Sequence, residues 1–532
     1  MTTRTVPASL DRPPVVIVRR RVPPGLLAAS AVAAGLVFLP LAWTLLQAFE
    51  VTLKDAVALL FRPLVGELLF NTLTLIGATT CAAAVIGTAA AWFVERTRLP
   101  GRRVFAVLAA VPLAIPAFIT SYAWVSISAG LQDFAGALLV VTSAYYPLVY
   151  LPVAAALRGM DPALEETARA LGESGWGCFR RVVLPQLKPA LLGGMLLVAL
   201  NTLSEFGAFG LLRFRTFTTE IYAEYRTGFN GPEASLLALV LVLLCLACLV
   251  AEVMVRGRAR YGRLARGTRR PAAFLDLGWA RVPVLAGFGL LILVTLGIPL
   301  GTILYWLTQH GSAAISPVAV TAAQLFNSTL SSLLLGLAGA AVTLALALPL
   351  GFLATRYEGR LITVLERTAY LAQGMPGIVV ALALVSLTVQ ALRPLYQSAA
   401  LLVIAYAILF LPLALVSVRA ALVQAQRGLE ESARALGLGW MAVVRRVLLP
   451  MAGPGLGAAA AMVFVSIVTE LTATLLLAPI GTRTLAVQVW ADTSTVAFAA
   501  AAPYAALMAA ISLLSTWILA RRFGGGAGVF AS

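Results

Sequence analysis

Long apolar blocks without a charged residue recur along the chain, and they constrain its fold more than any other feature. The segments 26–49 and 282–307 are two examples. Each is long enough to cross roughly 30 Å of hydrocarbon as a helix. Only 11% of the 532 residues are charged, against about 25% in soluble chains. The short alternating segments of a membrane β-barrel are lacking, so the sequence predicts an all-α polytopic membrane protein.

About twelve spanning helices are predicted, divided equally between the two halves of the chain. The first block follows a basic tail and lacks a clear small-x-small cleavage site, which is typical of an uncleaved spanning helix rather than a signal peptide. The predicted spans are 26–49, 68–94, 104–130, 136–157, 188–211, 233–255, 282–307, 327–354, 368–391, 397–418, 452–477 and 496–520.

The positive charges fall unevenly on the two sides of these spans. With the N-terminus inside, most of the 39 Lys and Arg residues lie in the inner segments. Cytoplasmic loops carry such an excess, so we expect both the N-terminus and the C-terminus to be cytoplasmic. The outer loops hold the remaining basic residues, Lys54, Arg62, Arg213, Arg215, Arg226, Arg393 and Arg483.

The chain divides into two similar halves. An offset of about 265 residues places Glu431 on Glu166 and Glu470 on Glu205, which indicates an internal duplication. Because each half has an even number of spans, we expect two tandem six-helix units of the same orientation, related by a pseudo-twofold axis along the membrane normal. The predicted parts are a cytoplasmic basic tail (1–25), a first unit (26–255), an Arg- and Gly-rich cytoplasmic linker (256–281) and a second unit (282–522).

A polar phrase occurs once in each half. EETARALG at 165–172 returns as EESARALG at 430–437. The two copies lie in predicted inner loops, at 158–187 and 419–452. An ordinary solvated basic loop has little physical reason to keep both spacing and sequence in two copies. Two copies that face one compartment suggest a docking partner that is itself a dimer.

The first copy has the signals of two short helices joined at a glycine. Asp161 is a good N-cap, and Pro162 suits the first helical position. The helix is expected to break at Gly172, after which Ser174 can cap a second helix. We expect Pro185 to end that second helix.

The second copy has the same pattern, with a break at Gly437 and an end at Pro450. Its N-terminal cap is weaker, because Gln426 and Arg427 replace the Asp-Pro pair of the first copy. We therefore expect the same helix–glycine–helix shape with a less well-defined start.

The two loops resemble the EAA loop of ABC importer permeases, the binding-protein-dependent inner-membrane transport components. The second family position, usually Ala, is Thr167 in one copy and Ser432 in the other; both are small. The matching residues are Glu166, Ala168, Gly172, Val182, Leu184 and Pro185, and Glu431, Ala433, Gly437, Val447, Leu449 and Pro450.

This resemblance implies a set of partners. In that family the loops form coupling helices that dock into a dimer of ATPase subunits on the cytoplasmic side, and a solute-binding protein delivers the solute outside. It also implies a multi-pass protein of the bacterial inner membrane, in contact with lipid. No cofactor is expected on this chain, since ATP and Mg²⁺ belong to the partner ATPase.

The chain is not expected to hydrolyse ATP itself. A P-loop needs a lysine after a Gly-rich loop, and the two lysines, Lys54 and Lys188, stand in LKDA and LKPA. The single histidine, His310, allows no histidine cluster. Cys245 and Cys248 form a C-x-x-C inside an apolar span without a second ligand pair, so they are interpreted as small buried hydrophobes.

The formal charge of +17 does not indicate nucleic-acid binding. Basic residues bind phosphate backbones when they cluster on an exposed face beside groups that read bases. Here they lie in the gaps between apolar blocks, where they set membrane topology. We therefore expect no nucleic-acid partner.

The cargo is indicated less directly. Fusion of two units in one chain resembles the ferric-iron importer permeases, with thiamine and aminoethylphosphonate permeases as relatives. The segments 204–222 and 469–490 look like the iron branch. The resemblance therefore implies import of ferric iron, and thiamine or a phosphonate stays as the alternative.

Two glutamates inside predicted spans are candidates for the translocation path. Glu205 and Glu470 occupy equivalent positions in the two fifth spans, and ionisable groups in spans usually face a cavity or a partner. Their oxygens suit transient contact with a hard metal cation. The alternative is that each is protonated or hydrogen-bonded between helices. The nearby outer loop with Arg213, Arg215, Glu220, Tyr222, Glu224, Tyr225 and Arg226 is expected to touch the binding protein.

Kinks are expected at Pro112, Pro116 and Pro376 in the third and ninth spans.

Two other classes of membrane protein remain open. A secondary transporter driven by an ion gradient would need intramembrane charge pairs or broken-helix ion sites, and would have no use for twin docking loops. A membrane scaffold without transport would have no use for the paired glutamates.

Overall fold

The computed structural model of the protein describes residues 22–228, 230–256, 274–309, 320–425 and 427–523. In this part of the chain the regular structure is helical, and a single isolated β-bridge joins Thr97 to Leu275. The first half contains α1 (Pro24–Ala48), α2 (Leu53–Leu60), α3 (Pro63–Arg96), α4 (Arg102–Leu108), α5 (Ala117–Ile127), α6 (Phe134–Tyr145), α7 (Pro147–Gly159), α8 (Pro162–Ala170), α9 (Gly175–Cys178), α10 (Leu184–Ser204), α11 (Gly207–Leu211), α12 (Phe217–Arg226) and α13 (Gly231–Arg256).

The second half has a similar order of elements, but one helix, α19, takes the place of α6 and α7, and no described helix corresponds to α2. The first long helix is interrupted by a π-turn between α14 and α15, and the bent helix pair α4–α5 returns as α17–α18. Its helices are α14 (Arg281–Ile292), α15 (Ile298–Thr308), α16 (Ala322–Arg356), α17 (Arg360–Leu371), α18 (Gly377–Gln390), α19 (Ala399–Gln424), α20 (Arg427–Ala435), α21 (Trp440–Val443), α22 (Leu449–Val468), α23 (Thr472–Leu477), α24 (Leu485–Ser494) and α25 (Phe498–Phe523).

The prediction of an all-α polytopic protein is confirmed. Among the described residues, 10 helices are long and apolar enough to cross a membrane, or up to 12 if each of two bent helix pairs counts as one span. The predicted spans 104–130 and 368–391 are not single helices, because the chain turns by 90° and 105° within them. The residues before Pro116 and Pro376 are extended, as the proline ring requires, so helices α5 and α18 start afresh there.

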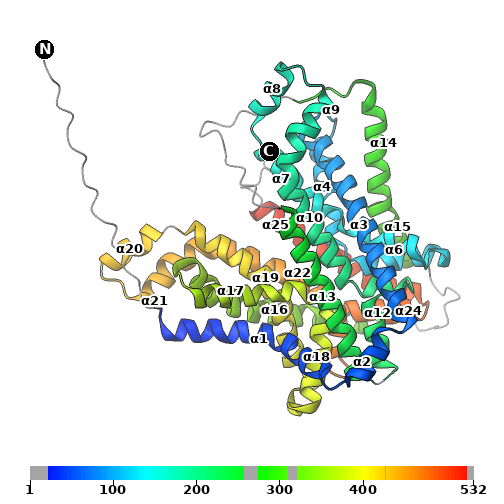
Figure 1. Ribbon diagram of the computed structural model, residues 1–532, viewed down its shortest axis with the longest axis vertical. Helices are drawn as coiled ribbons and strands as arrows, with labels where there is room; N and C mark the ends of the chain where they lie inside the picture. Colours follow the sequence, from blue (N-terminus) through cyan, green and yellow to red (C-terminus); the bar gives the residue numbers. More distant parts are fainter. Residues whose placement is uncertain (1–21, 229, 257–273, 310–319, 426, 524–532) are drawn as a thin grey trace.

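The first long helix of each half packs against the other half. Ala33 and Val37 of α1 belong to the core formed by α16, α17, α18 and α19. In the same way, Phe288 of α14 packs among α3, α4 and α7, with its ring centroid 4.9 Å from that of Phe105. Figure 1 shows α1 lying along the second-half helices and α14 standing beside the first-half helices. The two halves are therefore interlocked and not merely adjacent.

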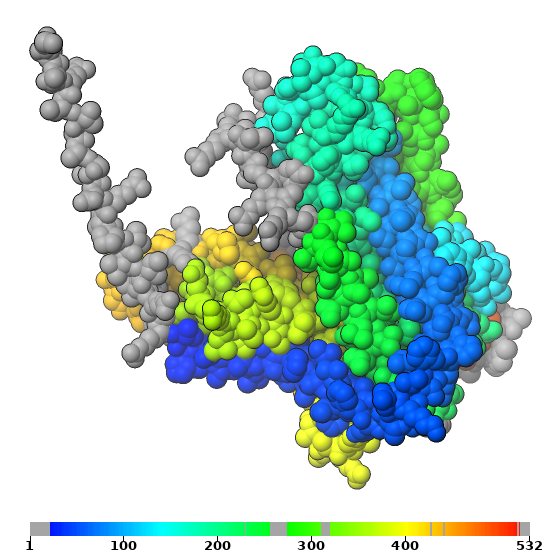
Figure 2. Space-filling view, in the orientation of Figure 1, coloured from blue at the N-terminus to red at the C-terminus, as the bar shows by residue number. Residues whose placement is uncertain are grey.

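The described helices form two arms that diverge from a common base. Figure 1 shows α3, α7 and α10 rising toward α8 and α9, whereas α16, α17, α19 and α22 extend sideways toward α20 and α21. The outline of the molecule in Figure 2 has a notch between the two arms. The two copies of the repeated phrase thus lie apart, at the ends of separate arms.

Candidate functional site

The first copy of the repeated phrase folds into two short helices joined at a glycine, as predicted. Helix α8 begins at Pro162, and the carboxylate of Asp161 accepts a 3.0 Å hydrogen bond from a backbone N–H of the first turn. Gly172 follows the helix with a φ of 86°, in the left-handed region that favours glycine. Ser174 then caps α9, and its hydroxyl accepts a 3.0 Å bond from the first turn of that helix.

The second copy closes in the same manner. Gly437 has a φ of 84°, and the carbonyl of Ala433 accepts a 3.1 Å hydrogen bond from the N–H of Leu438, as the C-terminal Schellman turn of a helix requires. The weaker cap expected at this copy involves Gln426, which lies outside the described residues. Arg427 begins α20.

The prediction that Pro185 ends the second short helix is wrong. The helix passes through a π-turn at Phe179–Val183 and continues as α10 to Ser204. Leu184 donates its backbone N–H to the carbonyl of Phe179, five residues back. This wider turn lets the helix run on through a proline that has no N–H to donate. Leu184 and Pro185 are both half-buried.

The second copy departs from the prediction in the same way. A π-turn at Val444–Leu448 leads directly into α22, which continues past Pro450 to Val468. Leu449 and Pro450 are exposed. In both halves, therefore, the loop is in unbroken helical contact with a spanning helix.

A buried ion pair ties α8 to the end of α3. Nη2 of Arg96, the last residue of α3, lies 2.8 Å from Oε1 of Glu165, and the two side chains are only 4% and 8% exposed. Arg169, one turn along α8, lies 3.8 Å from the other carboxylate oxygen of Glu165. Because both partners are shielded from water, their attraction is far less screened than that of a surface pair.

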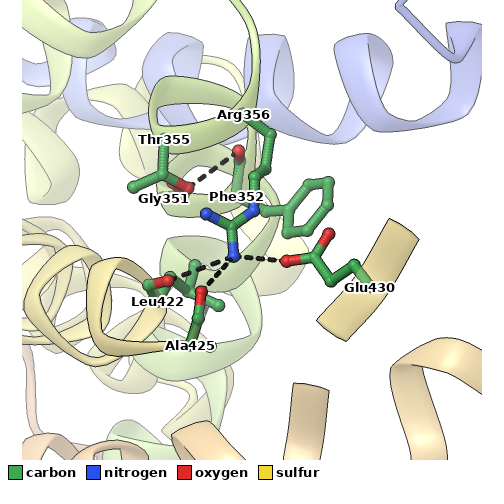
Figure 3. Close-up of polar contacts among 7 residues, drawn as sticks. All are labelled: Gly351, Phe352, Thr355, Arg356, Leu422, Ala425 and Glu430. Atoms are coloured by element: carbon green, nitrogen blue, oxygen red, sulfur yellow. Dashed lines mark hydrogen bonds and ion pairs between the residues drawn. The ribbon is translucent and has the colours of Figure 1, made fainter. Parts of the chain in front are cut away.

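The second half has an equivalent anchor. Arg356, the last residue of α16, forms an ion pair with Glu430 of α20, and both side chains are buried. The same guanidinium donates to the carbonyl oxygens of Leu422 and Ala425 near the end of α19, at 3.2 and 3.0 Å (Figure 3). One arginine therefore joins α16, the end of α19 and the repeated phrase.

Glu165 and Glu430 are functional candidates that the sequence reasoning missed. It singled out the next residue in each copy, Glu166 and Glu431, and both of those are exposed. A helical period gives the signal: Glu165 lies three residues before Ala168, so the two share a face, and Ala168 is buried at 8% exposure. The equivalent alanine of the second copy, Ala433, is 7% exposed.

The solvent-exposed surface of each repeated loop carries apolar side chains. Leu171 and Leu436, just before the two glycines, are 80% and 83% exposed, and Trp176 at the start of α9 is 71% exposed. Leu164 and Leu429, one position before the buried glutamates, are also exposed. Exposed apolar groups gathered on a short polar helix are typical of a protein-binding surface.

Glu205 lies at the end of α10 and is held by groups of its own half. Its Oε2 accepts a 2.5 Å hydrogen bond from the hydroxyl of Tyr145, and its Oε1 accepts a 2.8 Å bond from the N–H of Ala208. Its backbone carbonyl accepts a 2.7 Å bond from Thr218 of α12. These contacts fix the carboxylate at the break between α10 and α11.

Glu470 lies at the equivalent break between α22 and α23. Its Oε1 accepts a 2.9 Å hydrogen bond from the N–H of Ala473. The hydroxyl of Tyr406 lies 2.7 Å from Thr474, which in turn donates to the backbone carbonyl of Glu470. The carboxylate also lies beside Gly377 of α18, where a Cβ would be 3.3 Å from Oε1. Tyr406 thus reaches the backbone of Glu470 only through Thr474, whereas Tyr145 in the first half contacts the carboxylate of Glu205 directly.

The two glutamates lie where the halves meet. Gly207, two residues after Glu205, meets Leu471, the residue after Glu470. Beside them, a Cβ at Gly207 would come 2.7 Å from Leu471, and one at Gly210 would come 2.3 Å from the Trp490 ring. Both glycines are therefore needed for the close approach of α11 to the second half.

No ready-made metal centre accompanies these glutamates. Within the described ranges there is no group of three or more His, Cys, Asp and Glu residues that could hold a metal ion. Cys245 is buried and Cys248 is partly buried, and neither is in a disulfide. His310 lies outside the described residues.

The charged loop near Glu205 forms a short helix. Helix α12 starts with a capping box, in which Thr216 and Thr219 satisfy each other's backbone N–H groups. Burial, with the neighbouring Glu224 second, raises the pKa of Glu220 above its ordinary value. Arg213 has a φ of 53°, which is unusual for a residue other than glycine.

Two interlocked helical units, each with a helix–glycine–helix loop and a glutamate at the junction, define a two-unit membrane permease. The family described as binding-protein-dependent transport system inner membrane component matches the chain twice, at residues 83–259 and 347–523. The chain belongs to this family, whose members are permease subunits of ABC importers.

Individual relatives agree with this assignment. The Fe(3+)-transport system permease protein FbpB 2 of Haemophilus influenzae is 36% identical over 501 residues, which cover 94% of this chain and 98% of that protein. The sulfate transport system permease protein CysT of Escherichia coli is 30% identical over 204 residues, 34% of this chain and 73% of that protein. The molybdenum transport system permease protein ModB of Escherichia coli is 28% identical over 203 residues, 32% of this chain and 86% of that protein.

Proposed function

We propose that this chain forms the translocation path of an ATP-driven importer for ferric iron. The observation that carries the proposal is the extent of the likeness to the ferric permease of Haemophilus influenzae, which spans 94% of this chain and both of its units. The sulfate and molybdenum permeases are similar to about a third of the chain each. Thiamine and phosphonates are the alternative cargoes.

The repeated loops are the proposed docking sites for a dimer of ATPase subunits. Each presents an exposed leucine, Leu171 or Leu436, beside a glycine turn. Each is also anchored from behind, by Glu165 or Glu430, to the last arginine of a long helix. A partner that moves the loops therefore moves α3 and α16 as well as α10 and α22. Closure of the partner dimer would draw the two arms together, and the halves would rock about their interface.

ATP hydrolysis is assigned to the partner, together with its ATP and Mg²⁺. The only lysines in the chain are Lys54 and Lys188, and neither follows a Gly-rich loop. The positive-inside distribution supports a cytoplasmic location for both loops and both termini in a bacterial inner membrane. A solute-binding protein would then dock on the opposite side, where α12 lies.

Glu205 and Glu470 are proposed to contact the iron as it crosses between the halves. Carboxylate oxygens suit a hard trivalent cation, and the residues next to the pair bring the first and second units into contact. The two carboxylates have different hydrogen-bond partners, because the hydroxyl of Tyr145 donates to Glu205 and the carboxylate of Glu470 accepts from a backbone N–H. The ion would therefore meet them unequally.

The test is reconstitution in liposomes with the ATPase subunit and the binding protein. Uptake of radiolabelled ferric iron, thiamine and 2-aminoethylphosphonate is compared with and without ATP inside the vesicles. We expect ATP-dependent accumulation of iron alone. Uptake of thiamine or the phosphonate instead of iron would show that this compound is the cargo. Accumulation driven by an ion gradient without ATPase would overturn the importer mechanism in favour of a secondary transporter.

A further inference from the structure

A basic recess lies where the linker between the two halves meets the first unit. It has a volume of ≈ 350 Å³ and opens beside the end of α3 and the start of α4. It takes part in neither the repeated loops nor the glutamate pair. Its lining residues are Thr97, Arg98, Leu99, Pro100, Arg102, Phe274 and Arg281.

The recess is preformed by backbone hydrogen bonds. Leu275 of the linker donates its N–H to the carbonyl of Arg96 at 2.8 Å, and its carbonyl accepts from the N–H of Arg98 at 3.0 Å. This isolated bridge holds the linker against the loop that follows α3. The arginines of the two segments are therefore brought to one place before any ligand binds, which lowers the cost of ordering them.

Positive charge predominates in the recess. Arg98, Arg102 and Arg281 contribute three guanidinium groups. Asp276 lies 3.3 Å from Arg98, but both side chains of that pair are mostly exposed at the rim, so it neutralises at most one of the three. Glu95 also lies near Arg102, and its carboxylate is paired with Arg158 at 2.8 Å.

One arginine is oriented by an aromatic ring. The guanidinium carbon of Arg102 lies 4.1 Å from the ring centroid of Phe274, in a cation–π contact. Such stacking occupies the face of the guanidinium and leaves its N–H edge available. A planar array of donors of this kind suits the oxygens of a phosphate group.

Residues one or two positions from the lining arginines Arg102 and Arg281 are apolar and exposed. Val104 of α4 is 60% exposed, Val282 of α14 is 72% exposed, and Trp279 just before α14 is 87% exposed. Tryptophan is enriched at the level of lipid headgroups. Exposed apolar residues next in sequence to the arginines of a basic pocket match a ligand with a charged head and hydrocarbon tails better than they match free phosphate.

The second half does not repeat this arrangement. The segment after α16 reads Tyr357, Glu358, Gly359 and Arg360, with an acidic residue where the first half has an arginine-rich loop. The first half reads Thr97, Arg98, Leu99, Pro100 and Gly101 before two further arginines. The basic recess is thus a feature of the first unit and the linker, and not part of what the duplication preserves.

We propose that this recess binds the phosphate headgroup of an anionic phospholipid, whose acyl chains lie along the exposed apolar side chains beside it. Basic pockets at the inner surface of spanning helices bind anionic headgroups in this way. The bound lipid would hold the linker to the first unit through Arg281 on one side and Arg98 and Arg102 on the other. The inference stands apart from the proposed cargo, because it concerns a different surface.

Native mass spectrometry of the purified full chain tests the proposal. The protein in detergent is titrated with phosphatidylglycerol, with phosphatidylcholine of the same acyl chains, and with inorganic phosphate. We expect saturable retention of phosphatidylglycerol over phosphatidylcholine and no retention of phosphate. Equal retention of the two lipids would overturn the proposal. Retention of phosphate alone would also overturn it, because the ligand would then be a soluble anion and not a lipid.

Substitutions locate the site. Arg102→Ala is expected to weaken phosphatidylglycerol binding by about fivefold, and the triple variant R98A/R102A/R281A by about a hundredfold, since each arginine near a lipid surface contributes about 1 kcal/mol. Arg103→Ala is the matched control, because Arg103 is exposed on the same helix and does not line the recess. Equal losses in R102A and R103A would overturn the assignment to this recess. Thermal unfolding of each variant without lipid verifies that the fold is intact.

Discussion

Arg96 and Glu165 form an ion pair with 2.8 Å between Nη2 and Oε1, and this pair joins the end of a long helix to a surface loop. Arg356 and Glu430 do the same in the second half. A loop held only by its chain ends could move without its neighbours. Each of these loops is instead tied to a helix of 34 or 35 residues by a charge pair that water scarcely reaches.

Replacing Glu165 by Gln should loosen α8 without unfolding the protein. The substitution removes the carboxylate that is paired with the buried Arg96, and breaking a buried pair in this way costs about 3–5 kcal/mol. Because α8 is a short local unit, we expect the cost to appear as local opening. Hydrogen exchange of the α8 amides, measured by mass spectrometry, should accelerate by about two to four orders of magnitude.

Glu173→Gln is the matched control for this experiment. It breaks the pair between Glu173 and Arg181 in the same loop, where Arg181 is 73% exposed. Exposed pairs contribute about 0–1 kcal/mol, so exchange of α8 should stay near that of the wild-type protein. Equal acceleration in both variants would contradict a special role for the buried pair.

Substitutions at the two glycines should separate backbone strain from steric blockage. A Cβ on Gly172 or Gly437 would have no atom within 4 Å beyond the residues directly before and after it, so the cost of a side chain lies in the left-handed backbone. We expect about 1–2 kcal/mol for valine at each position and less for asparagine, which tolerates this conformation. The measure is co-purification of the ATPase subunit, which should be lost in G172V/G437V and largely retained in G172N/G437N. Loss in both double variants would point to a blocked surface and not to strain.

Local signals predicted the local geometry of these loops well. Asp161, Gly172 and Ser174 act through hydrogen bonds and dihedral angles within a few residues, and such interactions can be inferred from spacing. The ion pair between Glu165 and Arg96 joins two segments that are distant in the sequence. Residue spacing predicts only contacts between residues close in the sequence, so it could not predict this pair. The prediction that Pro185 ends a helix was wrong for a different reason: the π-turn that accommodates this proline has no sequence signature of its own.

The spans show the same division. Hydropathy placed the apolar segments, because the bilayer sets their length and composition. It could not give the direction of the chain inside the segments 104–130 and 368–391. Pro116 and Pro376 indicated kinks there, but packing decides whether a proline bends a helix gently or starts a new one at 90° or 105°. The packing of α1 on the other half could not be predicted either, because the sequence of an apolar helix does not show which helices it packs against.

The carboxylates at the junction give a prediction for transport. We expect E205Q/E470Q to lower iron uptake at least tenfold in the reconstituted system, because neutral amides attract a cation less strongly and bind it less well. ATPase-subunit binding should be unchanged, since the substitutions lie far along α10 and α22 from the loops. Unchanged iron uptake in the double variant would refute the proposed cation path.

Tyr145→Phe separates the two glutamates. It removes the hydroxyl that donates to Glu205 at 2.5 Å and leaves the contacts of Glu470 in place. The freed carboxylate should alter the concentration dependence of iron uptake, with a change of about 10- to 100-fold in KM, as expected for a hydrogen bond to a charged group. Tyr146→Phe is the neighbouring control, because Tyr146 is fully buried in the packing of the first half. A similar change in both variants would mean that packing, and not the bond to Glu205, is responsible.

Asp492 should make stability depend on pH. Burial raises the pKa of this carboxyl in α24 to about 6 from an ordinary 3.8, although the nearby Arg483 opposes the shift. Between these values the folded state binds more protons than the unfolded state, so stability falls as pH rises toward 6 and levels off above it. Asp492→Asn cannot ionise and should lack this fall. Relative to the wild-type protein, its unfolding midpoint should rise by about 1–3 °C at pH 7 and match it near pH 4. Glu67→Gln, an exposed carboxylate on α3, should follow the wild-type curve; a D492N curve parallel to wild type across this range would show that the ionisation of Asp492 does not differ between the folded and unfolded states.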